Sequence, residues 1–183
     1  MLVSACAEVR PSKIEVDIKN PDGDSMGSAT LEEQASGVKV SLALNGLEPG
    51  PHGIHFHANG DCEPPEFESA GDHYNPEEKD HGLLNQDGAH AGDLPNIVAK
   101  PDGTVAAELM AAGVTLKEGK TTLYKKDGTS LIIHENADDG MSQPAGNAGK
   151  RIACGVINLE EQQDKEKTKK AGDAKKKVSE EKE

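Results

Sequence analysis

A cluster of histidines in one part of the chain is best suited to metal chemistry. Six of the seven histidines lie within residues 52–93. There, the spacing His73-x7-His81-x8-His90-x2-Asp93 gathers three imidazoles and one carboxylate in a segment rich in Gly, Pro, Asn and Asp. Three nitrogen ligands and one oxygen ligand complete a tetrahedral zinc site with no open position, as in structural zinc sites.

A second pair of histidines precedes this group, in Gly53-Ile54-His55-Phe56-His57. Side chains two residues apart in a strand point to the same face of the sheet. His55 and His57 could therefore bind one metal ion together. The clustering carries this inference, because seven histidines in 183 residues is an ordinary number.

The elements that must position these residues are strands, because polar and apolar residues alternate along much of the chain. About eight short antiparallel strands are expected, with Pro101-Asp102-Gly103 and Lys126-Asp127-Gly128 predicting hairpins. The fold class is therefore all-β, an eight-stranded antiparallel Greek-key barrel or sandwich. The expected strands beside the histidine segment cover residues 13–19, 27–34, 38–44, 96–99, 104–110, 121–125, 130–134 and 151–159.

Two long segments, residues 58–95 and 135–150, do not have a strand pattern. Long irregular loops in a compact domain are usually functional, and a metal would order a loop with so little apolar surface. Residues 159–183 hold eight Lys and eight acidic residues and almost no apolar ones, which predicts a tail that is disordered or transiently helical. The alternative is a basic interaction site at Lys175–Lys177.

Length and charge suggest one domain, residues 12–158, flanked by segments 1–11 and 159–183. The net charge of −13 argues against nucleic acid as a partner. No apolar run approaches the roughly 20 residues that a membrane helix needs. However, Leu2-Val3-Ser4-Ala5-Cys6 resembles the end of a bacterial lipoprotein signal whose earlier part would lie upstream. Membrane attachment would then depend on a lipid at Cys6; the alternative is a frayed terminus with a free thiol.

Longer motifs add a family resemblance. The chain from about residue 12 to residue 157 resembles the copper/zinc superoxide dismutases of the bacterial envelope type. The resemblance implies an oxidoreductase that disproportionates the superoxide anion to dioxygen and hydrogen peroxide by cycling Cu(II) and Cu(I), with zinc structural. The matching stretches are Gly53–His57, Gly60–Cys62, Ser69–Pro76, His81–Gly82, His90–Asn96, Ile133–Glu135 and Gly146–Val156.

By this resemblance the metal ligands can be assigned residue by residue. His73 would bridge both metals as an imidazolate, and would release copper and take a proton during turnover. The implied copper ligands are His55, His57, His73 and His134, and the implied zinc ligands are His73, His81, His90 and Asp93.

Four further residues have roles implied by the resemblance. Asp138 would link a copper histidine to a zinc histidine, and Arg151 would attract the anionic substrate beside the copper. Cys62 and Cys154 match the family disulfide, and an oxidising location outside the cytoplasm, in the cell envelope, would permit that bond. A monomer and a homodimer are both compatible with the resemblance.

One segment departs from the family pattern. Residues 140–145 carry no charge, so steering of the substrate is expected to depend on Arg151, Lys150 and the metals. Two other functions compete with dismutation. One is a module that stores or delivers copper, although no Cys-x-x-Cys or Met-rich run occurs. The other is a structural envelope domain whose zinc only orders a loop, which would leave His55, His57 and His134 unexplained.

Overall fold

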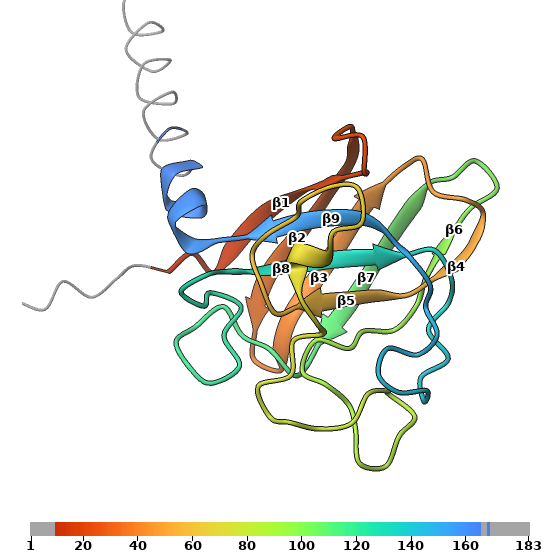
Figure 1. The fold of residues 1–183 in the computed structure, drawn as a ribbon. Coiled ribbons are helices and arrows are strands. Elements are labelled where there is room, and N and C mark those ends of the chain that lie inside the picture. Colours follow the sequence, from red (N-terminus) through yellow and green to blue (C-terminus); the bar gives the residue numbers. More distant parts are fainter. Residues whose placement is uncertain (1–9, 166–167, 169–183) are drawn as a thin grey trace, which may run out of the picture.

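The computed structural model describes residues 10–165 and residue 168, and Figure 1 shows their arrangement. Seven strands form one curled antiparallel sheet in the order β5-β8-β9-β1-β2-β3-β7, and β4 pairs with β6 in a small second sheet. The strands are β1 (Lys13–Lys19), β2 (Ser25–Gln34), β3 (Gly37–Leu44), β4 (Gly50–His52), β5 (Ile54–His57), β6 (Ile97–Ala99), β7 (Val105–Ala111), β8 (Thr129–His134) and β9 (Arg151–Ile157). The all-β prediction is confirmed, with nine strands among the described residues instead of eight.

The alternation of apolar residues determines which face of the sheet is buried. In β1, every second residue is buried, including Val16 and Ile18, which are fully inaccessible. The core inside the curled sheet is almost entirely aliphatic, and Phe56 of β5 is the largest fully buried side chain among the described residues. In contrast to β1, all residues of β5 and β8 are buried. These two strands therefore lie in the interior, where a metal site can be shielded from water.

The expected strand over residues 121–125 is absent, so the predicted hairpin with 130–134 does not form. This segment instead belongs to a loop, residues 112–128, in which Leu123 and Tyr124 are buried. The hydroxyl of Thr129 donates a hydrogen bond to the carbonyl of Leu123, 2.8 Å away. Since β8 already has β5 and β9 as neighbours, no sheet edge remains for a further strand there.

The turn at Pro101-Asp102-Gly103 forms as expected, but its two strands do not pair with each other. The amide of Gly103 donates to the carbonyl of Lys100 at 2.9 Å. β6 then pairs with β4, and β7 pairs with β3. The turn therefore connects the two sheets, and β4 is a strand that the sequence pattern did not indicate.

The chain after β9 also differs from the prediction. Residues 159–165 form a helix, whereas a tail that is disordered or only transiently helical was expected from residue 159. Leu159 and Gln162 are buried, and Lys165 lies 3.2 Å from Asp17 of β1. Cys6 and Lys175–Lys177 lie outside the described residues. Within the described part, no helix has the length and apolar character needed to cross a membrane.

Candidate metal centre

The first group of histidines comes from two adjacent strands. His55 and His57 point to the same face of β5, because they are two residues apart in a strand. β8 pairs with β5, and His134 ends β8 beside the start of β5. The amide of His134 donates to the carbonyl of Gly53 at 2.8 Å. Backbone pairing thus fixes His134 next to Gly53, which lies 81 positions earlier in the chain.

The long loop of residues 58–95 returns to the same strand. Isolated bridges join His57 to His73 and His55 to Asp93. Around them, the amide of Phe56 donates to the carbonyl of Gly92 at 2.9 Å. A side chain at Gly92 would collide with the carbonyl oxygen of Phe56, so glycine is required for this close approach. The bridges bring the loop histidines to the strand histidines.

Four buried imidazole nitrogens converge without any hydrogen-bond partner. Their ligand atoms lie within 4.8 Å of one another. An unpaired buried polar atom is costly, so four together indicate a site shaped for a cation. Neutral imidazoles suit copper, and this donor set fits a copper ion. The atoms are His55 Nδ1, His57 Nε2, His73 Nε2 and His134 Nε2.

The second nitrogen of each strand histidine is held by an acceptor. His57 Nδ1 lies 2.9 Å from the carbonyl oxygen of Gly71, and His134 Nδ1 lies 3.3 Å from that of Gly149. His55 uses its other nitrogen, Nε2, which lies 2.7 Å from a carboxylate oxygen of Asp138. Each acceptor favours the tautomer whose free nitrogen points into the cluster.

The second group shares His73 with the first. Asp93 Oδ1 lies 3.0 Å from His73 Nδ1, 3.1 Å from His81 Nδ1 and 3.3 Å from His90 Nδ1. Three nitrogens around one carboxylate fit the tetrahedral zinc set that the spacing predicted. His73 thus presents Nδ1 to this group and Nε2 to the other. The structure brings together all seven residues that the sequence indicated as ligands.

The electrostatics of the two groups differ. Burial lowers the pKa of His73 to about 4 and that of His134 to about 3, and it lowers the pKa of His57 well below its ordinary value. Burial also disfavours the charged form of His81, but hydrogen bonds to Asp138 and Asp93 outweigh it and raise the pKa to about 9. His57, His73 and His134 are therefore neutral at pH 7 and have lone pairs available for a metal.

Asp138 connects the two groups. Its carboxylate lies 2.7 Å from His55 Nε2 and 3.1 Å from His81 Nε2. Burial raises the pKa of Asp138, but the two histidine hydrogen bonds outweigh it and lower the pKa below its usual value. Gly146 leaves the necessary space, because a Cβ there would collide with the carboxylate. The connection agrees with the role implied for Asp138.

Two residues that support the site were not indicated by the sequence analysis. The side chain of Asn96 clamps the backbone of Asp138, accepting from its amide at 2.9 Å and donating to its carbonyl at 2.8 Å. Gln143 does the same for the backbone of His81, with both distances 2.9 Å. A side-chain amide can imitate a strand neighbour in this way, but no residue spacing reveals such a pairing.

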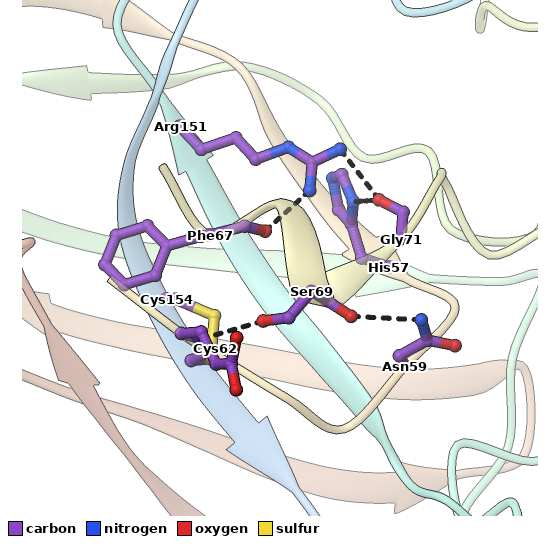
Figure 2. The surroundings of a disulfide bond; sticks show 9 residues. His57, Asn59, Cys62, Phe67, Ser69, Gly71, Arg151 and Cys154 are labelled. Atoms are coloured by element: carbon purple, nitrogen blue, oxygen red, sulfur yellow. Dashed lines mark hydrogen bonds between the residues drawn. A yellow bond between two sulfur atoms is a disulfide. The ribbon is translucent and has the colours of Figure 1, made fainter. Parts of the chain in front are cut away.

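The predicted disulfide between Cys62 and Cys154 is present, and Figure 2 shows its surroundings. The bond attaches the start of the loop 58–95 to β9. Arg151, also on β9, donates hydrogen bonds of 2.7 Å to the carbonyls of Phe67 and Gly71. The segment that the disulfide holds therefore fixes the guanidinium beside His57.

A cavity of about 750 Å³ lies beside the first group of histidines. His57, His73, His134 and Arg151 contribute to its wall. Lys150 does not line this cavity; it lines a neighbouring hollow, which Arg151 and Pro65 also line. The expected steering role of Lys150 therefore has no support from its position.

Comparisons with known proteins agree with this geometry. The family model described as copper/zinc superoxide dismutase matches residues 25–157. A relative named superoxide dismutase [Cu-Zn] 2, from Aquifex aeolicus, is 49% identical over 79% of this chain and 86% of its own length. Another, superoxide dismutase [Cu-Zn] from Caulobacter vibrioides, is 47% identical over 76% and 82%. The crystal structure of a superoxide dismutase-like protein from Bacillus subtilis superposes with a TM-score of 0.77, at 38% identity, covering 81% of this chain and 99% of that one.

The antiparallel β-fold and the two adjoining clusters of histidines define the class of this protein, which is that of β-proteins with two neighbouring metal sites. The chain belongs to the copper/zinc superoxide dismutase family. It is an oxidoreductase that uses copper and zinc to disproportionate superoxide to dioxygen and hydrogen peroxide. Bacterial members of this family generally act outside the cytoplasm, and a disulfide is typical of proteins from an oxidising compartment.

Proposed function

We propose that the first group of residues, His55, His57, His73 and His134, holds the copper ion of this dismutase. The second group, His73, His81, His90 and Asp93, would hold the zinc ion. The observation that carries the assignment is the convergence of four unpartnered, buried imidazole nitrogens beside a second donor set that shares His73.

Copper, when bound, would supply the one-electron redox chemistry that the disproportionation of two superoxide anions requires. The residues of the chain supply the rest. Arg151 attracts and orients the anion at the cavity wall. His73 can hold a proton at Nε2 and release it again, while Asp93 keeps Nδ1 in place. Asp138 fixes the rings of His55 and His81.

The direct test is to remove all metals, reload the protein with copper and zinc, and follow the decay of superoxide. We expect two ions per chain and fast decay, abolished when copper is removed with a chelator. Two ions without decay would favour the copper storage or delivery role. One zinc ion and no copper would favour the structural domain. Either result would overturn the assignment of a redox site.

We also propose attachment to the membrane through a lipid on Cys6, within an envelope location. The sequence Leu2–Cys6 supports this, although it lies outside the described residues. Mass spectrometry of the membrane fraction should find diacylglyceryl on Cys6, and the Cys6→Ser variant should be released. Recovery of unmodified protein in the soluble fraction would contradict it.

The chain is proposed to work as a monomer or homodimer, with residues 12–158 as the dismutase domain and 1–11 and 159–183 as appendages. Sedimentation equilibrium of the metal-loaded protein would distinguish the two association states. A truncated chain of residues 12–158 should retain activity if both appendages are dispensable. The helix at 159–165 packs on β1, so this truncation is expected to lower stability more than activity.

A further inference from the structure

The cavity beside the first group of histidines carries positive charges on a second wall, apart from that of Arg151. Arg151 is on one side, and the loop of residues 135–150 contributes only Pro144, Ala145 and Gly149 to the lining. The loop of residues 112–128 contributes two lysines, Lys120 and Lys125. This loop contains residues 121–125, whose sequence predicts a strand and indicates no role at the cavity.

Lys125 is held at the wall by specific contacts. Its Nζ donates a hydrogen bond of 2.7 Å to the carbonyl of Ala58, the residue after His57. The same ammonium lies 5.7 Å from the ring centroid of Tyr74, the residue after His73. The side chain is half-buried. A positive charge is therefore fixed between two segments that carry metal-binding histidines.

Lys120 is exposed at the mouth of the cavity, but its backbone is anchored. The hydroxyl of Tyr74 lies 3.2 Å from the carbonyl of Lys120 and 2.9 Å from that of Thr122. At the base of the loop, Glu33 accepts a hydrogen bond of 2.7 Å from the amide of Leu116. These contacts keep the loop, and with it the Lys120 charge, beside the histidines.

Acidic groups near the cavity only partly offset these charges. Among the residues that the structure describes, Asp72 is the one carboxylate in the lining of the cavity, and it faces Arg151. Glu77 interacts with Lys120, but its closer partner is Lys79, 2.8 Å away. The cavity thus carries three cationic side chains and one acidic one, whereas the whole chain has a net charge of −13.

We propose that Lys120 and Lys125 form a steering pair that draws anionic substrate into the copper-side cavity from the wall opposite the loop 135–150. The proposal rests on the proposed function of that cavity. A cleft lined by one sign of charge concentrates oppositely charged ligands and raises their association rate. The pair takes the place of the charges that residues 140–145 lack.

The test uses Lys120→Gln, Lys125→Gln and the double variant in the metal-loaded protein. The second-order rate of superoxide decay is measured against ionic strength. A second readout is the affinity of azide for Cu(II), followed by its charge-transfer absorption. For the double variant we expect a rate and an azide affinity about 3–10-fold lower at low salt, with a weaker salt dependence of both.

Lys126→Gln is the matched control, because Lys126 is the exposed neighbour of Lys125 and does not line the cavity. Lys125→Arg keeps the positive charge and should therefore retain the rate and the azide affinity that Lys125→Gln loses. The proposal is overturned if the double variant matches Lys126→Gln in salt dependence and azide affinity. It is also overturned if the loss is equal at all salt concentrations and the copper spectrum changes, since the lysines would then act on ligand geometry. The wild type could be inactive while its azide affinity still depends on the two lysines. That result would contradict dismutation but not the steering pair.

Discussion

His57 and Arg151 share one acceptor, the carbonyl oxygen of Gly71. His57 Nδ1 lies 2.9 Å from this oxygen and a terminal nitrogen of Arg151 lies 2.7 Å from it (Figure 2). One carbonyl in the segment held by the disulfide thus orients both an imidazole of the proposed copper site and the guanidinium proposed to attract the substrate. Because both side chains contact the same carbonyl oxygen, the loop fixes the position of Arg151 relative to His57.

The first prediction concerns this guanidinium. Arg151→Glu should lower the second-order rate of superoxide decay about tenfold or more, because it reverses a charge at the cavity wall. Copper content should persist, since Arg151 contributes no ligand atom to either group. Rate and metal content are measured on the same sample. Lys150→Glu is the control, because it makes the same change in charge at an exposed neighbour outside this cavity. Equal rates for the two variants would remove Arg151 from the mechanism.

The second prediction concerns Asp138. Asp138→Asn should weaken zinc binding about 10–100-fold, because the carboxylate that orients His81 is lost. Competition with a chromophoric zinc chelator measures the change. Asp139→Asn removes the same charge from the same loop without contact to a histidine, and it should bind zinc like the wild type. If both variants lose zinc equally, the loop as a whole and not the carboxylate is responsible.

The third prediction concerns the disulfide. Replacing Cys62 and Cys154 by Ala should lower the free energy of unfolding by about 4–5 kcal/mol, as the chain-entropy model gives for a closed loop of this length. The bond spans 92 residues. Urea denaturation of the metal-free protein, with and without reductant, provides the measurement. Reductant should destabilise the wild type and leave the double variant unchanged; a wild type insensitive to complete reduction would refute the prediction.

The fourth prediction concerns pH. The side chain of Glu33 is only 9% exposed. Burial raises its pKa, but hydrogen bonds from Leu116 and Thr115 and the charge of Lys117 outweigh this and lower it. Since the folded pKa lies below the unfolded one, the stabilisation is fully present above the unfolded pKa and is lost as pH falls through the folded pKa.

Glu33→Gln should therefore destabilise the metal-free protein by about 1–2 kcal/mol at pH 7. The difference from the wild type should shrink below about pH 4.5, the ordinary value for this carboxyl. Denaturation at a series of pH values measures it. Glu32→Gln is the matched control, because the adjacent Glu32 is more exposed and pairs only with surface lysines. A difference that stays constant from pH 7 to pH 3 would contradict the assignment.

The ligand set could be inferred from sequence because most of its members are close together in the chain or fall on one face of a strand. The spacing of His73, His81, His90 and Asp93 alone indicates zinc. His134 is distant, and only the family resemblance connected it to His55. The structure supplies the physical reason, which is the pairing of β5 with β8.

The surroundings of the site were harder to predict. Residues 121–125 have a strand-like composition, but tertiary contacts of Leu123 and Tyr124 override that preference. With a strand expected there, the sequence does not connect Lys120 and Lys125 with the proposed copper site. Asn96 and Gln143 are likewise undetectable by spacing, because each recognises backbone groups and no particular side chain.

The bond between Cys62 and Cys154 closes a covalent ring that contains His73, His81, His90, Asp93 and His134. The most exposed apolar turn of this ring is Leu83–Leu84, at 50% and 72% exposure. A protease that cuts there would produce two peptides still joined through sulfur. The nicked protein would migrate as one species without reductant and as two with it. The ring therefore protects the centre against loss of a fragment after cleavage in an oxidising environment where proteases act.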